Sequence, residues 1–224
     1  MTESSESNKL AILLFDRITA LDAVGPYEVL SRLPGIETCF VAKEKGPIRT
    51  DNRSLGLVAD YTFEEISEPY MLLIPGGFGV TEVMKDEAPL NWIRKAHEKT
   101  QWTTSVCTGS LILAAAGLLK GLKATCHWAS LDLLEGYGAQ PTKERIVREG
   151  KIMTAAGVSA GIDMGLQLAA FEADENVAKT IQLSIEYDPQ PPFDCGSPDK
   201  APKAMVDFIL SKNKQRYSAH AAKQ

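Results

Sequence analysis

Cys107 is the residue of this sequence best suited to nucleophilic chemistry. It follows a polar-edged, β-branched run at 103–106 that predicts a short buried strand, and it precedes an apolar run at 111–116 that predicts a buried helix. A side chain at such a sharp strand-to-helix turn projects above the sheet, beside the unpaired N–H groups of the helix start. These groups favour negative charge, so we expect a lowered pKa and more thiolate at Cys107. The alternative is a buried, inert cysteine.

A cysteine nucleophile needs a partner that handles protons, and Asp22 is the first candidate. It stands in an apolar setting shortly before the Gly25–Pro26 pair. Burial raises the pKa of a carboxyl group, which would let Asp22 act as an acid or exchange a proton with the thiol. Asp22 is equally suited to be the N-cap of the helix expected at 21–30, and the two roles are compatible.

Four further residues could complete the same site. Gly76 and Gly77 follow another expected strand, where they would present N–H groups as an oxyanion hole or simply form a turn. The Thr108 hydroxyl could bind a carboxylate or substrate, or satisfy local backbone groups. His127 is the best histidine for the pocket and would make a Cys–His pair as a base, although a histidine beside Trp128 is as often structural. His97 falls on the charged face of an expected helix, where we predict that it faces solvent.

Strands that alternate with helices must position these residues. The sequence predicts strands at 10–15, 38–42, 55–59, 70–74, 103–106 and 124–127, a hairpin at 145–147 and 152–154, and helices at 21–30, 63–66, 80–84, 89–99, 111–116, 128–135, 159–171, 174–185 and 203–212. Pro89 suits a first helical position, Gly136 a helix end, and Ser159 and Asp174 are candidate N-caps. The alternation predicts a single doubly wound, flavodoxin-like α/β sandwich with a mostly parallel sheet and a cysteine nucleophile elbow. We expect a disordered N-terminal tail at 1–8, one domain at 9–212 and a polar C-terminal tail at 213–224.

The candidate residues converge because three suspect stretches, 16–26, 75–79 and 107–110, each come directly after an expected strand. In an open parallel sheet, ligands bind beyond the carboxyl ends of the strands. The topology therefore predicts one shared active site.

Composition excludes several classes of protein. The 224 residues carry a net charge of −5, which gives no electrostatic support to nucleic-acid binding. Four scattered cysteines and three histidines form neither a disulfide framework nor a zinc pattern. The polar start lacks a signal peptide, and no apolar run approaches the roughly 18 residues of a membrane span. We expect a soluble cytoplasmic protein that acts on a small molecule, with neither nucleic acid nor membrane as a partner.

Five stretches together resemble a known family: 21–30, 74–77, 105–109, 125–128 and 159–164. They look like the ThiJ/PfpI superfamily, with its class I glutamine-amidotransferase-like fold, and the match runs in order through nearly the whole chain. Within that superfamily, Asp22, the Cys107–Thr108 pair and the Pro-Pro-Phe-Asp stretch at 191–194 are most similar to the isonitrile (isocyanide) hydratase group.

The resemblance implies an activity and a set of roles. Cys107 would attack the terminal carbon of an isocyanide, Asp22 would supply a proton, and Thr108 would support them. A thioimidate would form, and water would release an N-substituted formamide. Gly76, Gly77, His127 and Ile162 would form the oxyanion and substrate-binding positions. The resemblance implies no metal or organic cofactor, and a homodimer.

Departures from the family pattern leave other functions open. PfpI-type peptidases carry a histidine directly after the nucleophile, where this chain has Thr108, so a protease triad is disfavoured. Glyoxalase-like and chaperone members usually carry a Glu where Asp22 stands. Related regulators fuse a similar domain to a helix-turn-helix, and this chain ends about where that part would begin. The alternatives are therefore another thiol-dependent enzyme for a small electrophile, such as an α-oxoaldehyde, or a ligand- or redox-sensing homodimer in which Cys107 is oxidised.

Overall fold

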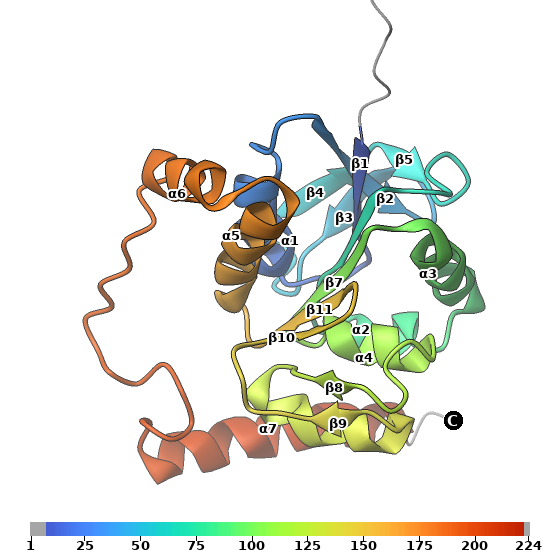
Figure 1. Ribbon diagram of the computed structural model, residues 1–224. Coiled ribbons are helices and arrows are strands. Elements are labelled where there is room, and N and C mark those ends of the chain that lie inside the picture. Colours follow the sequence, from blue (N-terminus) through green and yellow to red (C-terminus); the bar gives the residue numbers. More distant parts are fainter. Residues whose placement is uncertain (1–7, 222–224) are drawn as a thin grey trace, which may run out of the picture.

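A seven-stranded sheet lies at the centre of the computed structural model, which describes residues 8–221 (Figure 1). Its order is β10-β11-β7-β6-β1-β2-β5, and every neighbouring pair is parallel except β10 and β11. The strands are β1 (Asn8–Leu13), β2 (Ile36–Ala42), β5 (Tyr61–Thr62), β6 (Met71–Ile74), β7 (Trp102–Val106), β10 (Ile146–Glu149) and β11 (Ile152–Ala155). The predicted α/β fold is confirmed, including the hairpin at its edge.

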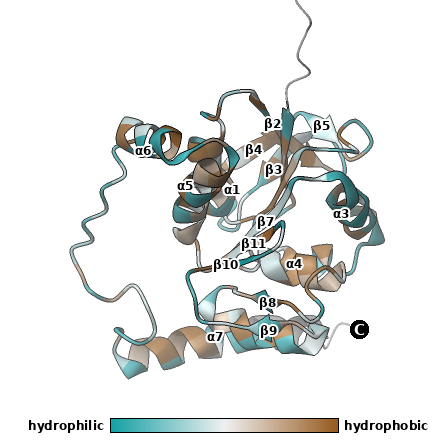
Figure 2. Cartoon of the chain, viewed as in Figure 1, coloured by the Kyte–Doolittle hydropathy of each residue, from teal (hydrophilic) through white to brown (hydrophobic). Residues whose placement is uncertain are grey.

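Helices cover both faces of this sheet (Figure 1). On one face, α1 (Ala20–Leu30) packs against α5 (Ala160–Glu172), which in turn contacts α6 (Glu175–Ser184). On the other face, α4 (Gly109–Ala115) contacts α2 (Val80–Val83) and α3 (Glu87–Lys99). Figure 2 shows α4 as hydrophobic along most of its length and α3 as mostly hydrophilic. This fits the burial of α4, whose Leu111, Ile112 and Leu113 are wholly inaccessible.

The order of the strands places a switch point between β1 and β6. From β1 the chain proceeds outward to β2 and β5, and it then returns to β6 and continues the other way to β7 and β11. Loops that leave β1 and β6 therefore diverge to opposite faces of the sheet and leave a crevice at its carboxyl edge. This is the place where open α/β sheets bind ligands.

Smaller elements complete the structure. An antiparallel pair, β3 (Gly46–Arg49) and β4 (Gly56–Ala59), and a parallel pair, β8 (Lys123–Ala124) and β9 (Gln140–Pro141), flank the main sheet. The 3₁₀ helix η1 (Trp128–Tyr137) follows β8, and an extended segment after α6 leads to the long helix α7 (Lys203–Ala221). Within residues 8–221, no helix is long and apolar enough to cross a bilayer.

Several local predictions were wrong, for reasons of capping and chain geometry. Residues 63–66 form turns, and the strand expected at 124–127 is limited to Lys123–Ala124. Helix α3 starts two residues before Pro89, because the Asp86 side chain accepts the Ala88 N–H and caps it. The helix expected at 128–135 is a 3₁₀ helix that continues past Gly136 to Tyr137, and its C-cap is Gly138, whose positive φ of 77° suits glycine.

The two predicted N-caps behave differently. Asp174 accepts hydrogen bonds from the N–H groups of Asn176 and Val177, as expected. Ser159 occupies the N-cap position of α5 but makes no capping bond; instead its hydroxyl accepts from the Arg145 guanidinium at 3.3 Å. The final helix is also longer than the predicted 203–212, so part of the expected polar tail is helical. Residues 1–7 and 222–224 of the expected tails lie outside the described residues.

Candidate active site

Cys107 stands on the predicted elbow between β7 and α4. Its φ of +60° lies in the left-handed region, which costs a residue other than glycine about 1–3 kcal/mol and persists only where surrounding contacts impose it. The Cys107 N–H donates to the carbonyls of Ala155 and Ala156 at 3.0 and 2.9 Å, which ties the elbow to the end of β11. Glycine follows at 109 of necessity, since a Cβ there would lie 2.0 Å from the Ile74 carbonyl oxygen.

The predicted lowering of the Cys107 pKa is wrong for this structure. The side chain is only 6% exposed. Burial raises the pKa of the thiol well above its usual value, and the nearby Asp22 carboxyl raises it further. The N–H groups of Thr108 and Val158 point to the sulfur and lower its pKa, but by less than burial raises it. The helix start therefore acts as expected and is outweighed, so that the resting thiol keeps its proton.

Asp22 lies beside Cys107 at the base of the site. It is wholly inaccessible to solvent, and its Oδ2 accepts the Gly76 N–H at 2.9 Å. Burial raises the pKa of Asp22 to about 7, against smaller lowering effects of the Gly76 N–H and the Cys107 thiol. Within the described residues, Oδ1 is buried without an ordinary hydrogen bond. The N-cap alternative is wrong, because Thr19 occupies that position of α1 and Asp22 is its third residue.

Gly76, Gly77 and Thr108 form the frame around that carboxyl. A Cβ at Gly76 would lie 2.6 Å from the Thr108 Oγ1 and 2.8 Å from Asp22 Oδ2, so only glycine lets the loops close. The Gly77 N–H donates to Thr108 Oγ1 at 3.0 Å. Both glycine N–H groups are thus engaged within the protein. They hold Asp22 and Thr108 in place, and this differs from the oxyanion hole that the sequence suggested for them.

Above this frame opens a cavity of about 310 Å³. It is lined by Thr19, Asp51, Gly77, Phe78, Cys107, Thr108, His127, Ala129, Ser130, Val158, Phe208, Ile209, Lys212 and Asn213. The structure therefore brings Cys107, Thr108, Gly77 and His127 together around one space, with Asp22 and Gly76 buried directly behind it.

His127 is positioned by a polar network beneath the elbow. Ser110, the second residue of α4, donates to the Thr125 carbonyl at 2.6 Å, and the Thr125 N–H donates to Thr154 Oγ1 at 3.0 Å. These bonds fix the segment that carries the histidine. Its Nδ1 accepts the Ala129 N–H at 3.3 Å, so the neutral ring carries its proton on Nε2.

Two other residues that the sequence analysis considered do not line the cavity. Ile162, expected to bind substrate, belongs to α5 and packs against Gly25 of α1. His97, expected to face solvent, is half-buried, with its Nδ1 2.8 Å from Thr103 Oγ1. Burial lowers the pKa of His97.

Sequence reasoning missed the wall of the cavity that α7 contributes. Phe208, Ile209, Lys212 and Asn213 share one helical face at i, i+1, i+4 and i+5 spacing, which the sequence displays. The sequence has no signal for where that face docks, because an extended segment of Pro-rich chain separates it from α6.

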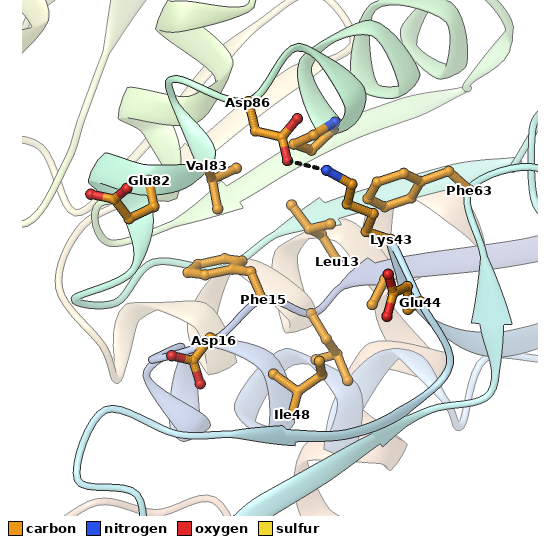
Figure 3. Close-up of a pocket in the computed structure, with 13 residues that line it drawn as sticks. Leu13, Phe15, Asp16, Lys43, Glu44, Ile48, Phe63, Glu82, Val83 and Asp86 are labelled. Atoms are coloured by element: carbon orange, nitrogen blue, oxygen red, sulfur yellow. Dashed lines mark hydrogen bonds and ion pairs between the residues drawn. The ribbon is translucent and has the colours of Figure 1, made fainter.

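A second cavity, of about 290 Å³, lies over the carboxyl ends of β1 and β2 (Figure 3). Leu13, Phe15 and Ile48 form part of its apolar lining, and Lys43 and Asp86 pair at its rim at 2.8 Å. Within residues 8–221, no group of three or more His, Cys, Asp or Glu side chains is suited to hold a metal ion.

The fold and this site together define a flavodoxin-like α/β protein with a cysteine at its strand-to-helix elbow and a buried carboxyl behind it. The model of the DJ-1/PfpI family matches residues 8–170, and the chain belongs to that family. The family resemblance seen in the motifs is thereby confirmed.

Individual proteins of known function or structure are similar to this chain over most of its length. The chain is 46% identical to an isonitrile hydratase of Pseudomonas putida over 199 residues, which cover 89% of this chain and 87% of that protein. It is 31% identical to the HTH-type transcriptional regulator CdhR of Pseudomonas aeruginosa, over 75% of this chain but 50% of the regulator. A ThiJ/PfpI family protein from Pseudomonas syringae has a crystal structure with a TM-score of 0.91 and 38% identity, covering 96% of this chain and 90% of that one.

Proposed function

We propose that this protein is an isonitrile hydratase, which adds water to an isocyanide and releases an N-substituted formamide. The similarity to the Pseudomonas putida enzyme covers most of both chains and supports this class of reaction. The observation that carries the proposal is the pairing of Cys107 with Asp22, whose buried carboxyl has a pKa of about 7. A proton donor active near neutral pH thus stands beside a nucleophile in a cavity suited to a small molecule.

The first step forms the thioimidate. Protonated Asp22 gives its proton to the terminal carbon of the isocyanide, which makes that carbon electrophilic. The Cys107 sulfur bonds to the same carbon, and the thiol proton passes to the Asp22 carboxylate. Asp22 has then lost one proton and gained one, and the intermediate is R–N=CH–S–Cys. Burial raises the pKa of both groups, so both start neutral and no isolated charge persists in the buried site.

The second step hydrolyses that intermediate. Water adds to the C=N carbon while Asp22 relays a proton to the nitrogen. The resulting tetrahedral species collapses when the C–S bond breaks, the sulfur recovers a proton, and the formamide carbonyl forms. Thr108 orients substrate through its hydroxyl, and His127 contributes polar lining to the same cavity. Gly76 and Gly77 act through the N–H groups that hold Asp22 and Thr108.

We further propose that the protein works as a cytoplasmic homodimer. Cys39, Cys107, Cys126 and Cys195 are all free, which suits a reducing compartment. Large apolar side chains remain exposed outside the cavity, among them Leu183 and Phe193, and a second copy would bury some of them. Light scattering coupled to size-exclusion chromatography tests the dimer: a molar mass near 24.4 kDa would contradict it, since that is the mass of one chain.

The test of the activity is a direct assay with a simple alkyl or aryl isocyanide, in which formamide is quantified by mass spectrometry. Purified protein should produce formamide well above a Cys107→Ala control. Methylglyoxal serves as a parallel substrate, because it represents the α-oxoaldehyde alternative. Turnover of methylglyoxal without turnover of any isocyanide would replace the hydratase proposal by that alternative.

A further inference from the structure

Helix α7 comes back to the active site from outside the family-wide part of the chain. The matched family region ends at residue 170, and α7 spans Lys203–Ala221. The extended segment between α6 and α7 runs out along one side of the molecule and returns beneath the sheet, where α7 packs alongside η1 (Figure 1).

Asn213 fixes α7 at this place. Its side-chain amide donates to the Ala129 carbonyl and to the Ser130 hydroxyl, the latter at 3.0 Å, and the side chain is half-buried. Both partners lie within three residues of His127, which lines the cavity. One polar side chain thus sets the distance between α7 and the reactive end of the site.

The face that α7 presents to the cavity is apolar at Phe208 and Ile209. These side chains are 62% and 43% exposed, and Lys212 places its ammonium group 5.7 Å from the centre of the Phe208 ring. When a ligand covers large apolar side chains that line a cavity and face water, the apolar surface removed from water makes the binding free energy more favourable.

The chemistry of an isocyanide directs its substituent toward this face. The C≡N–R unit is linear, so when the carbon meets the Cys107 sulfur the substituent extends away from the elbow. Cys107, Thr108 and His127 occupy the reactive end of the cavity, and α7 supplies much of the remaining lining. An apolar R group would meet Phe208 and Ile209.

We propose that α7 sets the substrate preference of the Cys107 cavity. Phe208 and Ile209 are specificity-determining residues that receive the apolar substituent of the isocyanide, and Asn213 is a positioning residue that holds them there. The proposal rests on the proposed isonitrile hydratase function.

The experiment compares steady-state kinetics for methyl isocyanide and benzyl isocyanide in the wild-type protein, Phe208→Ala, Ile209→Ala and Asn213→Ala. The control is Met205→Ala, which removes an exposed apolar side chain of the same helix that does not line the cavity. In Phe208→Ala, kcat/KM for benzyl isocyanide should fall about tenfold through KM, as expected for lost contacts in an apolar pocket. The value for methyl isocyanide should stay within about twofold. Ile209→Ala and Asn213→Ala should shift the ratio in the same direction, and Met205→Ala should leave it unchanged.

Equal losses for both isocyanides, or a loss in kcat alone, would overturn the proposal. Light scattering on each variant tests whether this face is instead a contact between two copies of the chain. A drop in molar mass for Phe208→Ala, with an unchanged ratio of kcat/KM for the two isocyanides, would assign the face to that contact.

If no isocyanide is turned over, that result contradicts the proposed function. A second measurement then still tests whether α7 receives apolar groups. The rate of Cys107 alkylation by iodoacetamide and by N-benzyl iodoacetamide is followed by peptide mass mapping, which separates Cys107 from exposed Cys195. If α7 receives apolar groups, Phe208→Ala should slow the benzyl reagent relative to the smaller one. An unchanged ratio of rates would exclude the role of α7.

Discussion

Two cavities of nearly equal size, about 310 and 290 Å³, lie at the carboxyl edge of the sheet, and each includes or adjoins an aspartate. Asp22, behind the Cys107 cavity, is wholly buried, and burial raises its pKa to about 7. Asp86, at the rim of the other cavity, pairs with Lys43 and caps α3, and both contacts lower its pKa. Cavity size therefore does not distinguish the two, whereas the burial and the pKa of Asp22 and Asp86 do.

The difference follows from where the strands change direction. Asp22 comes after β1 and Gly76 after β6, and these two strands flank the switch point of the sheet. The other cavity is lined by the ends of β1 and β2 and by residues of the segment that follows β6, and there Lys43 remains exposed and neutralises Asp86. The switch point lets two loops enclose a carboxyl without supplying a cation, and an acid that keeps its proton near neutral pH is the result.

The strongest test of the comparison is removal of the nucleophile. Cys107→Ala should lower isocyanide hydration by about 10⁴-fold, because no other group in the cavity can form the thioimidate. Cys195→Ala changes a thiol that is exposed on the extended segment before α7 and should leave the rate within about twofold. Formamide release by the two variants is the measurement. Substantial activity in Cys107→Ala would mean that the elbow has no covalent role.

The second test replaces each of the two carboxyls by an amide, in separate variants. Asp22→Asn keeps the shape but removes the transferable proton, so kcat/KM should fall by about 10² to 10⁴-fold. Asp86→Asn is the matched control, because asparagine still caps a helix and the lost ion pair is exposed; its kcat/KM should stay within about twofold. Similar losses in both variants would show that the pKa difference between the carboxyls has no bearing on function.

Much of this site is readable in the sequence, because its parts obey local rules. The buried run before Cys107, the apolar run after it and the loops that follow strands predicted the elbow and its convergence with Asp22. Propensity and periodicity also located the main strands and most helices. The family motifs added the activity, which local rules do not provide.

What the sequence did not predict depends on contacts distant along the chain. The Cys107 pKa is set by how deeply the fold encloses the thiol, and the sequence displays only the helix start that opposes this effect. The hydrogen bonds that the Gly76 and Gly77 N–H groups make depend on how the loops after β1, β6 and β7 come together. The docking of α7 depends on Asn213 finding Ala129 and Ser130, more than 80 residues away in the chain.

The third test is the pH dependence of the reaction. The first step needs protonated Asp22, so kcat/KM for an isocyanide should be highest below pH 7 and fall toward tenfold per pH unit above about 7. The sign follows from the raised pKa: the active form is the acid, and it is lost as pH rises through that value. Asp86→Asn should keep this limb, while the residual activity of Asp22→Asn should lack it. A profile flat from pH 6 to 9 in the wild-type protein would contradict the assignment of Asp22 as the acid.

The smallest expected effect concerns Thr108, whose hydroxyl binds the same glycine loop that holds Asp22. Thr108→Val removes the hydroxyl that accepts the Gly77 N–H, and kcat/KM should fall about tenfold. Thr108→Ser restores a hydroxyl and should recover most of the activity. The unpaired N–H in Thr108→Val also costs about 1–3 kcal/mol of folding free energy, so thermal unfolding is measured in parallel. A lowered Tm with an unchanged kcat/KM would assign Thr108 to loop structure alone, and would leave Asp22 and Cys107 as the groups that separate this cavity from the one at Asp86.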